Sequence, residues 1–414
     1  MTRHALITAA GLVLAAAVVA ADTESPSTAA SPSAGFLYGS VETRNGQTIT
    51  GFLRWDDEEA FWSDHFNGSK AELPYLELAE GREPDPDGTW WQRLVERLGG
   101  DLRLASEGRV VAVRFGDLAK IEVGRGDEVV LTLRDATELE FDGGSNDIGA
   151  TVVVRDAQLG VVEVPWRKIA SVTFAPAPAD ADPGAFRLRG TVTTDAGELA
   201  GPIQWDSEEC LSTDILDGDT DDGRVKLEMG RIRSIERRDG RSALVTLRDG
   251  TSMVLSGTND VNRDIRGILV DDPRFGRVEV PWKAFERAVF DEPGGSGPGY
   301  ADFAPPRPLS GAVTTRGGER LAGRLVFDLD EAWSWEMLDG AADDLDYSIP
   351  FALVASLEPA GSSGTLVRLR GGEELRLEDS HDVDPENDGV AVLPAGGGDP
   401  RYVPWREIER IELD

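Results

Sequence analysis

The chain has 414 residues, 40% of them hydrophobic, which is enough for roughly two to four globular domains and argues against general disorder. It carries 42 Lys and Arg against 76 Asp and Glu, so its formal net charge is −34 at pH 7. Such a surface repels phosphate backbones, so we expect no nucleic acid partner. The partner classes that this charge allows are cations, basic proteins and neutral polymers.

The N-terminus has the three parts of a secretory signal peptide. It begins MTRH, continues with an apolar run at 5–20 and reaches small residues just before Asp22. We expect residues 1–21 to be removed on export to the periplasm or the cell exterior. A retained membrane anchor is the alternative, since the apolar run is slightly short for a span. No cysteine stands near the cleavage site for a lipid anchor, and no later segment is apolar enough to cross a bilayer.

Cys210 is the only cysteine, so an intramolecular disulfide cannot form even though export would permit one. It follows two carboxylates, Glu208 and Glu209, in a strand-like stretch. Such surroundings raise the pKa of a thiol. The sequence therefore predicts a structural Cys210.

One line of sequence occurs three times with small changes. It reads VVEVPWRKIASVTF at 161–174, RVEVPWKAFERAVF at 277–290 and RYVPWREIERIEL at 401–413. Each copy has a β-branched alternating stretch, a proline that removes a ladder donor, a short turn with a Trp, and a second apolar stretch. Three copies of a strand ending predict three copies of a folding unit.

Stretches rich in Pro, Ala, Gly and Ser precede each unit, which is typical of linkers between tandem domains. Unit one carries a surplus at about 69–108 relative to the other two. The predicted organisation is a linker at 22–34, unit one at 35–174, a linker at 175–185, unit two at 186–290, a linker at 291–308 and unit three at 309–414.

Each unit follows one plan twice, in a front half and a back half. Every half opens with a hairpin whose turn suits positive φ. The turns are at Asn45-Gly46, Asp135-Ala136, Ala196-Gly197, Asp249-Gly250, Gly317-Gly318 and Gly371-Gly372. Further short strands follow, with one turn of helix before the last.

This plan of strand number, strand length and turn placement resembles the small five-stranded β-barrels of the SH3, Sm-like and PRC-barrel type. The resemblance covers each half-unit and implies a fold class without implying a function. We therefore expect an all-β protein of three tandem units, each a pair of small barrels, with a short helical insertion in the first.

The insertion in unit one is the asymmetric feature of the chain. Asp87 or Thr89 can cap a short helix there, which Gly99-Gly100 would end. Insertions between strands often carry binding function. Trp90 and Trp91 are therefore candidate ligand-binding residues.

The sequence has no catalytic signature. After signal removal only His65 and His381 remain, and neither has a partner at metal-ligand spacing. No Ser stands in a nucleophile elbow, and the Gly-rich run at 294–299 contains a proline. We expect a protein that is not an enzyme and needs no cofactor. A hydrolase with unidentified catalytic carboxylates is the alternative, since paired acids suffice for glycosidases.

Two sets of carboxylates are candidate cation ligands. Asp147, Asp260 and Asp382 occupy the same place in the three copies, where an Asp that accepts backbone N–H groups is the expected structural role and a cation or polar-ligand site the alternative.

The stretch 217–228 spaces carboxylates as an EF-hand loop does. These are Asp217, Asp219, Asp221 and Glu228. Its glycine is one position late and its flanks are strand-like, so we expect a solvated acidic hairpin there instead of a calcium site.

A Trp follows the proline of each repeated line, at Trp166, Trp282 and Trp405. Lying between two apolar stretches, these rings are expected to cover a seam in the core. The alternative is an exposed stacking face of a carbohydrate-associated module. The sequence as a whole predicts an exported, non-catalytic binding or scaffolding protein whose partner is an unknown protein or polysaccharide.

Overall fold

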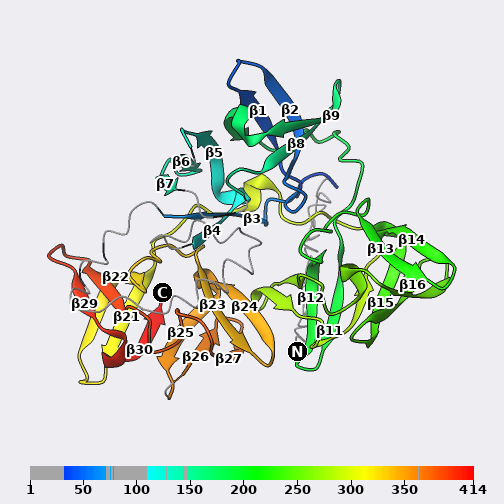
Figure 1. Ribbon diagram of the computed structural model, residues 1–414. Coiled ribbons are helices and arrows are strands. Elements are labelled where there is room, and N and C mark those ends of the chain that lie inside the picture. The colour runs from blue at the N-terminus through cyan, green and yellow to red at the C-terminus, as the bar shows by residue number, and fades with distance from the viewer. Residues whose placement is uncertain are drawn as a thin grey trace, which may run out of the picture. The chain divides into compact units, whose positions relative to one another are not determined.

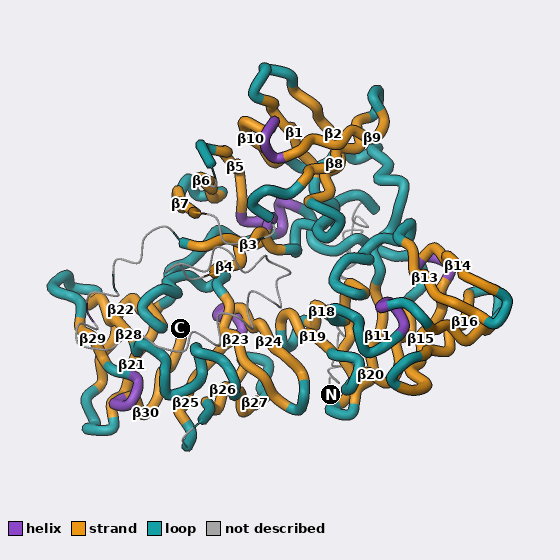
Figure 2. Tube along the Cα trace, viewed as in Figure 1, coloured by secondary structure: helices purple, strands orange, loops and turns teal. Residues whose placement is uncertain are grey.

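A computed structural model describes residues 32–70, 75, 78, 110–126, 128–142, 145, 147–361 and 363–414. Over these residues the chain is built of antiparallel strands joined by turns, and its helices are single 3-10 turns (Figures 1 and 2). The all-β prediction is confirmed. The predicted signal peptide, most of the 22–34 linker and nearly all of the insertion, Trp90 and Trp91 included, lie outside the described residues.

The first set of strands forms an eight-stranded sheet and a separate hairpin. Its strands are β1 (Tyr38–Thr43), β2 (Thr48–Trp55), β3 (His65–Ser69), β4 (Val110–Arg114), β5 (Leu118–Val123), β6 (Glu128–Leu133), β7 (Glu138–Asp142), β8 (Thr151–Asp156), β9 (Gly160–Pro165) and β10 (Ile169–Phe174). The sheet order is β7-β6-β5-β10-β1-β2-β8-β9, and β3 pairs with β4.

The second set has the same order with ten added to every label. Its strands are β11 (Arg189–Thr194), β12 (Gly197–Trp205), β13 (Ile215–Thr220), β14 (Gly223–Glu228), β15 (Ile232–Asp239), β16 (Ser242–Leu247), β17 (Ser252–Ser256), β18 (Ile268–Asp272), β19 (Gly276–Val280) and β20 (Phe285–Phe290). Here the β13-β14 hairpin joins the sheet through β17, which gives the order β14-β13-β17-β16-β15-β20-β11-β12-β18-β19.

The third set has the order β27-β26-β25-β30-β21-β22-β28-β29. Its strands are β21 (Ser310–Thr315), β22 (Arg320–Phe327), β23 (Met337–Ala342), β24 (Leu345–Pro350), β25 (Val354–Pro359), β26 (Thr365–Leu369), β27 (Glu374–Leu377), β28 (Val390–Pro394), β29 (Arg401–Val403) and β30 (Ile408–Leu413). The described 3-10 turns are η2 (Phe115–Asp117), η3 (Trp166–Lys168), η4 (Met229–Arg231), η5 (Asn259–Val261), η6 (Tyr300–Asp302), η7 (Phe351–Leu353) and η8 (Trp405–Glu407).

The six predicted hairpin turns are present, each between two paired strands. The second residue of every turn has a positive φ, as these tight connections require. The values are 82° at Gly46, 69° at Ala136, 134° at Gly197, 90° at Gly250, 83° at Gly318 and 101° at Gly372.

The two halves of each set exchange strands. In the second set, the front hairpin β11-β12 pairs with β20 and β18 of the back half. The back hairpin β16-β17 pairs in turn with β15 and β13 of the front half. The sequence predicts one barrel per half, whereas the structure builds each five-strand group from two strands of one half and three of the other. Local turn chemistry determines the hairpins, but the alternating pattern does not specify which half supplies the partner.

The second and third sets share one sheet. Strand β19 pairs with β24, with Val278 opposite Tyr347, so that β18, β19, β24 and β23 follow one another (Figure 2). A single buried apolar cluster runs through both sets. The first set has a core of its own, to which Phe303 and Trp335 contribute.

The stretch predicted as a linker at 291–308 packs against the first set. The backbone N–H of Gly35 donates to Ser296 Oγ at 2.9 Å, and the hydroxyl of Tyr300 donates to the carbonyl of Leu118 at 2.7 Å. The rings of Tyr300 and Trp62 lie 4.5 Å apart. Gly and Pro content predicts an aperiodic backbone here, but the aromatic side chains within the stretch anchor it.

The Trp residues of the repeated line are buried. Trp166, Trp282 and Trp405 are 8%, 3% and 6% exposed. Trp166 lies 6.0 Å from the ring of Trp55, and Trp405 lies 5.7 Å from that of Phe327. No helix among the described residues is long and apolar enough to span a membrane.

Replacing Trp282 with alanine should lower the free energy of unfolding by about 3–5 kcal/mol, the usual cost of emptying a large aromatic site. The change removes a ring contact with Phe285 and the hydrogen bond from the indole N–H to the carbonyl of Asp239. Urea titration of the full chain measures the loss. Trp333→Ala, at a half-buried site, is the control and should cost less; equal losses would contradict the seam role.

Candidate functional site

An acidic turn follows the second strand of every set. It folds the chain back against the aromatic residue that ends this strand. Its first residue has a positive φ in all three sets, at Asp56 (47°), Asp206 (50°) and Asp328 (47°). Asp tolerates this backbone region better than most residues. The fourth residue then pairs with the aromatic backbone. In the second set, the Trp205 N–H donates to the carbonyl of Glu209 at 2.8 Å.

In the first and second sets, the predicted Asp column contacts the same aromatic residue. The indole N–H of Trp205 donates to the carbonyl of Asp260 at 2.8 Å, and Trp55 makes the same bond to Asp147 at 3.1 Å. The three carboxylates accept backbone N–H groups of another strand, from Asn67 to Asp147 (2.6 Å), from Asp217 to Asp260 (2.7 Å) and from Asp339 to Asp382 (2.7 Å). These are long-range bonds to β3, β13 and β23, and not local turns.

Burial is the main cause of raised pKa values at these carboxyls. It raises the pKa of Asp147 to about 7, that of Asp260 to about 6 and that of Glu209 to about 9, with further increases from neighbouring carboxylates. In the acidic turns and the Asp column, four buried oxygens make no hydrogen bond to the described residues, namely Glu59 Oε2, Asp147 Oδ1, Glu209 Oε2 and Glu331 Oε2. Neutral, protonated acids fit these positions better than ionised ligands do.

The third acidic turn brings together residues that could hold a cation. Ligand atoms of Asp328, His381 and Asp388 lie within 4.8 Å of one another, and so do those of Asp328, Asp330 and Glu331. His381 Nδ1 lies 2.6 Å from Asp328 Oδ2. Imidazole and carboxylate together suit several divalent metals.

The second set has a positive side chain at the corresponding place. The guanidinium of Arg266 pairs with Asp206 at 2.7 Å and also with Glu208. Sequence reasoning selected Asp382 in the third set and missed Asp328 and Asp388. Aligning NDVNRDIR at 259–266 with HDVDPEND at 381–388 would have revealed Arg266 opposite Asp388.

The EF-hand-like spacing falls on the β13-β14 hairpin. Asp217 and Asp219 lie in β13, Glu228 ends β14, and Asp221 is in the turn between them. Arg224 pairs with the Asp217 carboxylate at 2.6 Å across the hairpin. This carboxylate already has a cationic partner.

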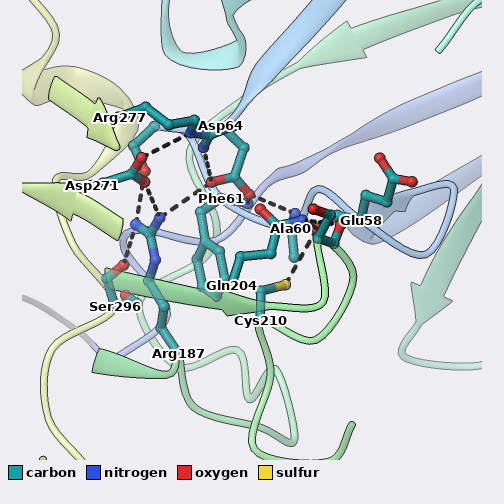
Figure 3. Close-up of polar contacts among 12 residues, drawn as sticks. Glu58, Ala60, Phe61, Asp64, Arg187, Gln204, Cys210, Asp271, Arg277 and Ser296 are labelled. Carbon is teal, nitrogen blue, oxygen red and sulfur yellow. Dashed lines mark hydrogen bonds and ion pairs between the residues drawn. The ribbon is translucent and has the colours of Figure 1, made fainter. Parts of the chain in front are cut away.

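A buried ion-pair network lies between the first and second sets, at Asp64, Arg187, Asp271 and Arg277 (Figure 3). Arg187 Nη2 is 3.2 Å from both Asp64 Oδ1 and Asp271 Oδ2, and Arg277 Nε is 2.9 Å from Asp271 Oδ1. The side chains of Arg187 and Asp64 are only 4% and 5% exposed. Although burial opposes it, Arg277 and Arg187 hold the pKa of Asp271 below its usual value.

Asp64 also fixes the loop that follows the acidic turn. Its Oδ2 accepts the backbone N–H groups of Ala60 and Phe61, each at 2.9 Å. The Arg187 guanidinium lies over the Phe61 ring, 4.2 Å from its centroid. A single carboxylate therefore closes a loop of one set and binds a cation of another.

The same device recurs in the other two sets. Asp214 accepts the N–H groups of Cys210 and Leu211 and pairs with Arg54 of the first set at 2.7 Å. Glu336 accepts those of Ala332 and Trp333 and pairs with Lys70 of the first set. We name Asp64, Asp214 and Glu336 the loop-closing carboxylates.

Cys210 lies beside this network and is buried. Its Sγ donates to the carbonyl of Glu58 at 3.4 Å, and burial raises the pKa of the thiol well above its usual value. A small cavity is lined by Cys210, Gln204 and Arg187, among others. The centre of a water molecule can occupy about 10 Å³ of it. It has space for no more than one water.

No known protein family, curated protein or solved structure matches the chain.

Asp147 should make the protein less stable as the pH rises. Its folded pKa of about 7 exceeds the unfolded value of about 3.9, so its contribution is fully present below about pH 4 and is lost as the pH rises through 7. Asp147→Asn should remove a pH-dependent loss of unfolding free energy on the order of 4 kcal/mol, measured by urea titrations from about pH 4 to pH 9.

Asp156→Asn is the control of opposite sign. Asp156 is half-buried at the end of β8, and the N–H groups of Leu159 and Gln158 lower its pKa. Its contribution is present above the unfolded pKa and lost in acid. If Asp147→Asn lost as much stability with rising pH as the unmodified chain does, the buried-acid interpretation would be wrong.

Arg187→Met should cost about 3–5 kcal/mol of unfolding free energy, because the buried Asp64 and the half-buried Asp271 lose a shared cation. Arg274→Met is the matched control. Arg274 pairs with Asp272 at 2.7 Å, but its side chain is 45% exposed, so its removal should cost no more than about 1 kcal/mol. Similar losses of unfolding free energy in the two variants would show that the buried network stabilises the fold no more than an exposed ion pair does.

Proposed function

We propose that this is an exported, non-catalytic binding or scaffolding protein whose β-modules are held in a fixed arrangement. The observation that carries the proposal is the loop-closing carboxylate, which recurs in all three sets with a cation from another set. Burying ion pairs costs free energy that hydrophobic contacts would not. Retaining three of them favours a role in specifying geometry, which a scaffold needs.

The resemblance to SH3, Sm-like and PRC-type barrels fits such a role. Each five-strand group contains a single turn before one strand, as in β9-η3-β10 and β14-η4-β15. Small barrels of this kind serve many unrelated functions, so the resemblance supports a modular platform and does not specify its ligand. The signal-like N-terminus supports export, and mass spectrometry of the secreted chain should place the mature start near Asp22.

A hydrolase is the second candidate, and one observation favours it. Glu209 and Asp260 are neighbouring carboxyls with pKa values of about 9 and about 6, and unequal pairs are what acid–base catalysis uses. Both pack around Trp205 in the core, which leaves little room for a substrate. The carbohydrate alternative finds no support at Trp166, Trp282 and Trp405, because these rings are buried.

Spin labels can test whether the arrangement is fixed. Glu138→Cys in the first set and Arg241→Cys in the second are exposed positions for labels, in a Cys210→Ser background. Electron paramagnetic resonance should give one narrow distance distribution. Combining Arg54→Met with Arg187→Met should broaden it, and Arg274→Met should not. A broad distribution before any network change would overturn the scaffold proposal.

Catalysis is tested with fluorogenic glycoside, ester and phosphate substrates. We expect no turnover above that of heat-denatured protein. Turnover that disappears in both Glu209→Gln and Asp260→Asn would replace the scaffold proposal with the hydrolase.

A further inference from the structure

The ladder between β19 and β24 shows how one set attaches to another. Strand β19 ends the five-strand group of the second set, and β24 is the outer strand of the β23-β24 hairpin in the third. Their register places Arg277 opposite Ser348, Val278 opposite Tyr347 and Glu279 opposite Asp346. The chain therefore already contains one ladder in which an edge strand of one set pairs with an edge strand of another.

The counterparts of these two strands are open. In the first set β9 corresponds to β19, and in the second set β14 corresponds to β24, by sheet order and by the turn that follows each strand. Among the described residues, β9 pairs only with β8, and β14 pairs only with β13. Unpaired edges of this kind present N–H and C=O groups to any strand of suitable shape.

The β9 edge is apolar, and no strand of the described chain covers it. Leu159 and Val161 are each 59% exposed, the most exposed large apolar side chains of the described chain. Gly160 and Gly276 begin the two corresponding strands with φ of 76° and 80°. A Cβ at Gly276 would meet Pro350 and the carbonyl of Ser348 across the ladder, whereas no described residue lies within 4 Å of one at Gly160. Among the described residues, no strand occupies beside β9 the place that β24 takes beside β19.

The β19-β24 register can be transferred to β9 and β14. It places Val162 opposite Val225, and Glu163 opposite Arg224. An apolar pair and an opposite-charge pair directly across a ladder both stabilise it. The existing ladder has two acids, Glu279 and Asp346, at the corresponding charged position. Arg224 is 58% exposed while it pairs with Asp217, so its guanidinium is accessible from outside.

We propose that β9 of one copy of this chain pairs with β14 of a second copy, in the register of β19 and β24. The contact joins unlike surfaces, so it produces a ring or an open chain of copies. A ladder of a few residues buries little area, and weak association is expected. The net charge of −34 opposes it at long range, so added salt should strengthen association until repulsion is screened. The inference does not depend on the proposed function.

Sedimentation velocity of the mature chain tests the proposal. The weight-average mass should rise with concentration from about 1 μM to about 100 μM, the range in which weak contacts become populated. Glu163→Arg alone and Arg224→Glu alone should each weaken association about tenfold or more, because each places like charges across the ladder. A mixture of the two single variants should recover it in part, since opposite charges then face each other at every contact between unlike chains.

Two exposed charges elsewhere supply matched controls. Glu138→Arg lies on β7, a different edge of the first sheet, and Arg241→Glu lies at the tip of the β15-β16 hairpin. Each control substitution should change association only as much as its change in net charge does. Thermal melts of the Glu163, Glu138 and Arg241 variants should agree with that of the unmodified chain, since these positions are exposed. Arg224→Glu should lower the melting temperature only slightly, because the pair that it loses with Asp217 is exposed on the Arg224 side. A chain that stays monomeric at about 100 μM, or controls that weaken association as much as Glu163→Arg does, would overturn the proposal.

Discussion

One kind of interaction attaches the first strand set to both of the others, a carboxylate that closes its own loop and binds a cation from another set. Asp64, Asp214 and Glu336 each accept two successive backbone N–H groups, which stabilises the loop after the acidic turn. Without a cation, a carboxylate buried this deeply would be costly. The local fold of each loop and the attachment of its set are therefore energetically coupled.

Strand exchange makes each set a single cooperative structure. The ladder between β15 and β20 joins the two five-strand groups, and each group takes strands from both halves. Contacts of this kind link residues far apart in the chain, so neither half buries its apolar face until the other is present. High sequence separation of contacts is typical of slow folding.

Much of the local structure could be predicted from the sequence. The six hairpin turns follow from Gly, Asn and Asp at adjacent positions, and alternation identified the strands around Val278 and Val280. The exchange between halves could not be predicted, because hairpins of nearly equal pattern can pair with either half. The ion network was missed for a different reason. Charged residues such as Arg187 and Asp64 are common in this acidic chain, and only the fold brings these two together.

The strand exchange has a consequence for the half-set as a unit. A chain that carried only one half, with its hairpin, second hairpin and closing strand, would lack the three strands that complete the five-strand group of its first hairpin. It would complete its sheets only with a second identical chain, each supplying what the other lacks. In its strand pairing, every set of ten strands resembles a strand-swapped dimer of two similar halves joined in a single polypeptide, with the connection between β5 and β6, or between β15 and β16, as the fusion point.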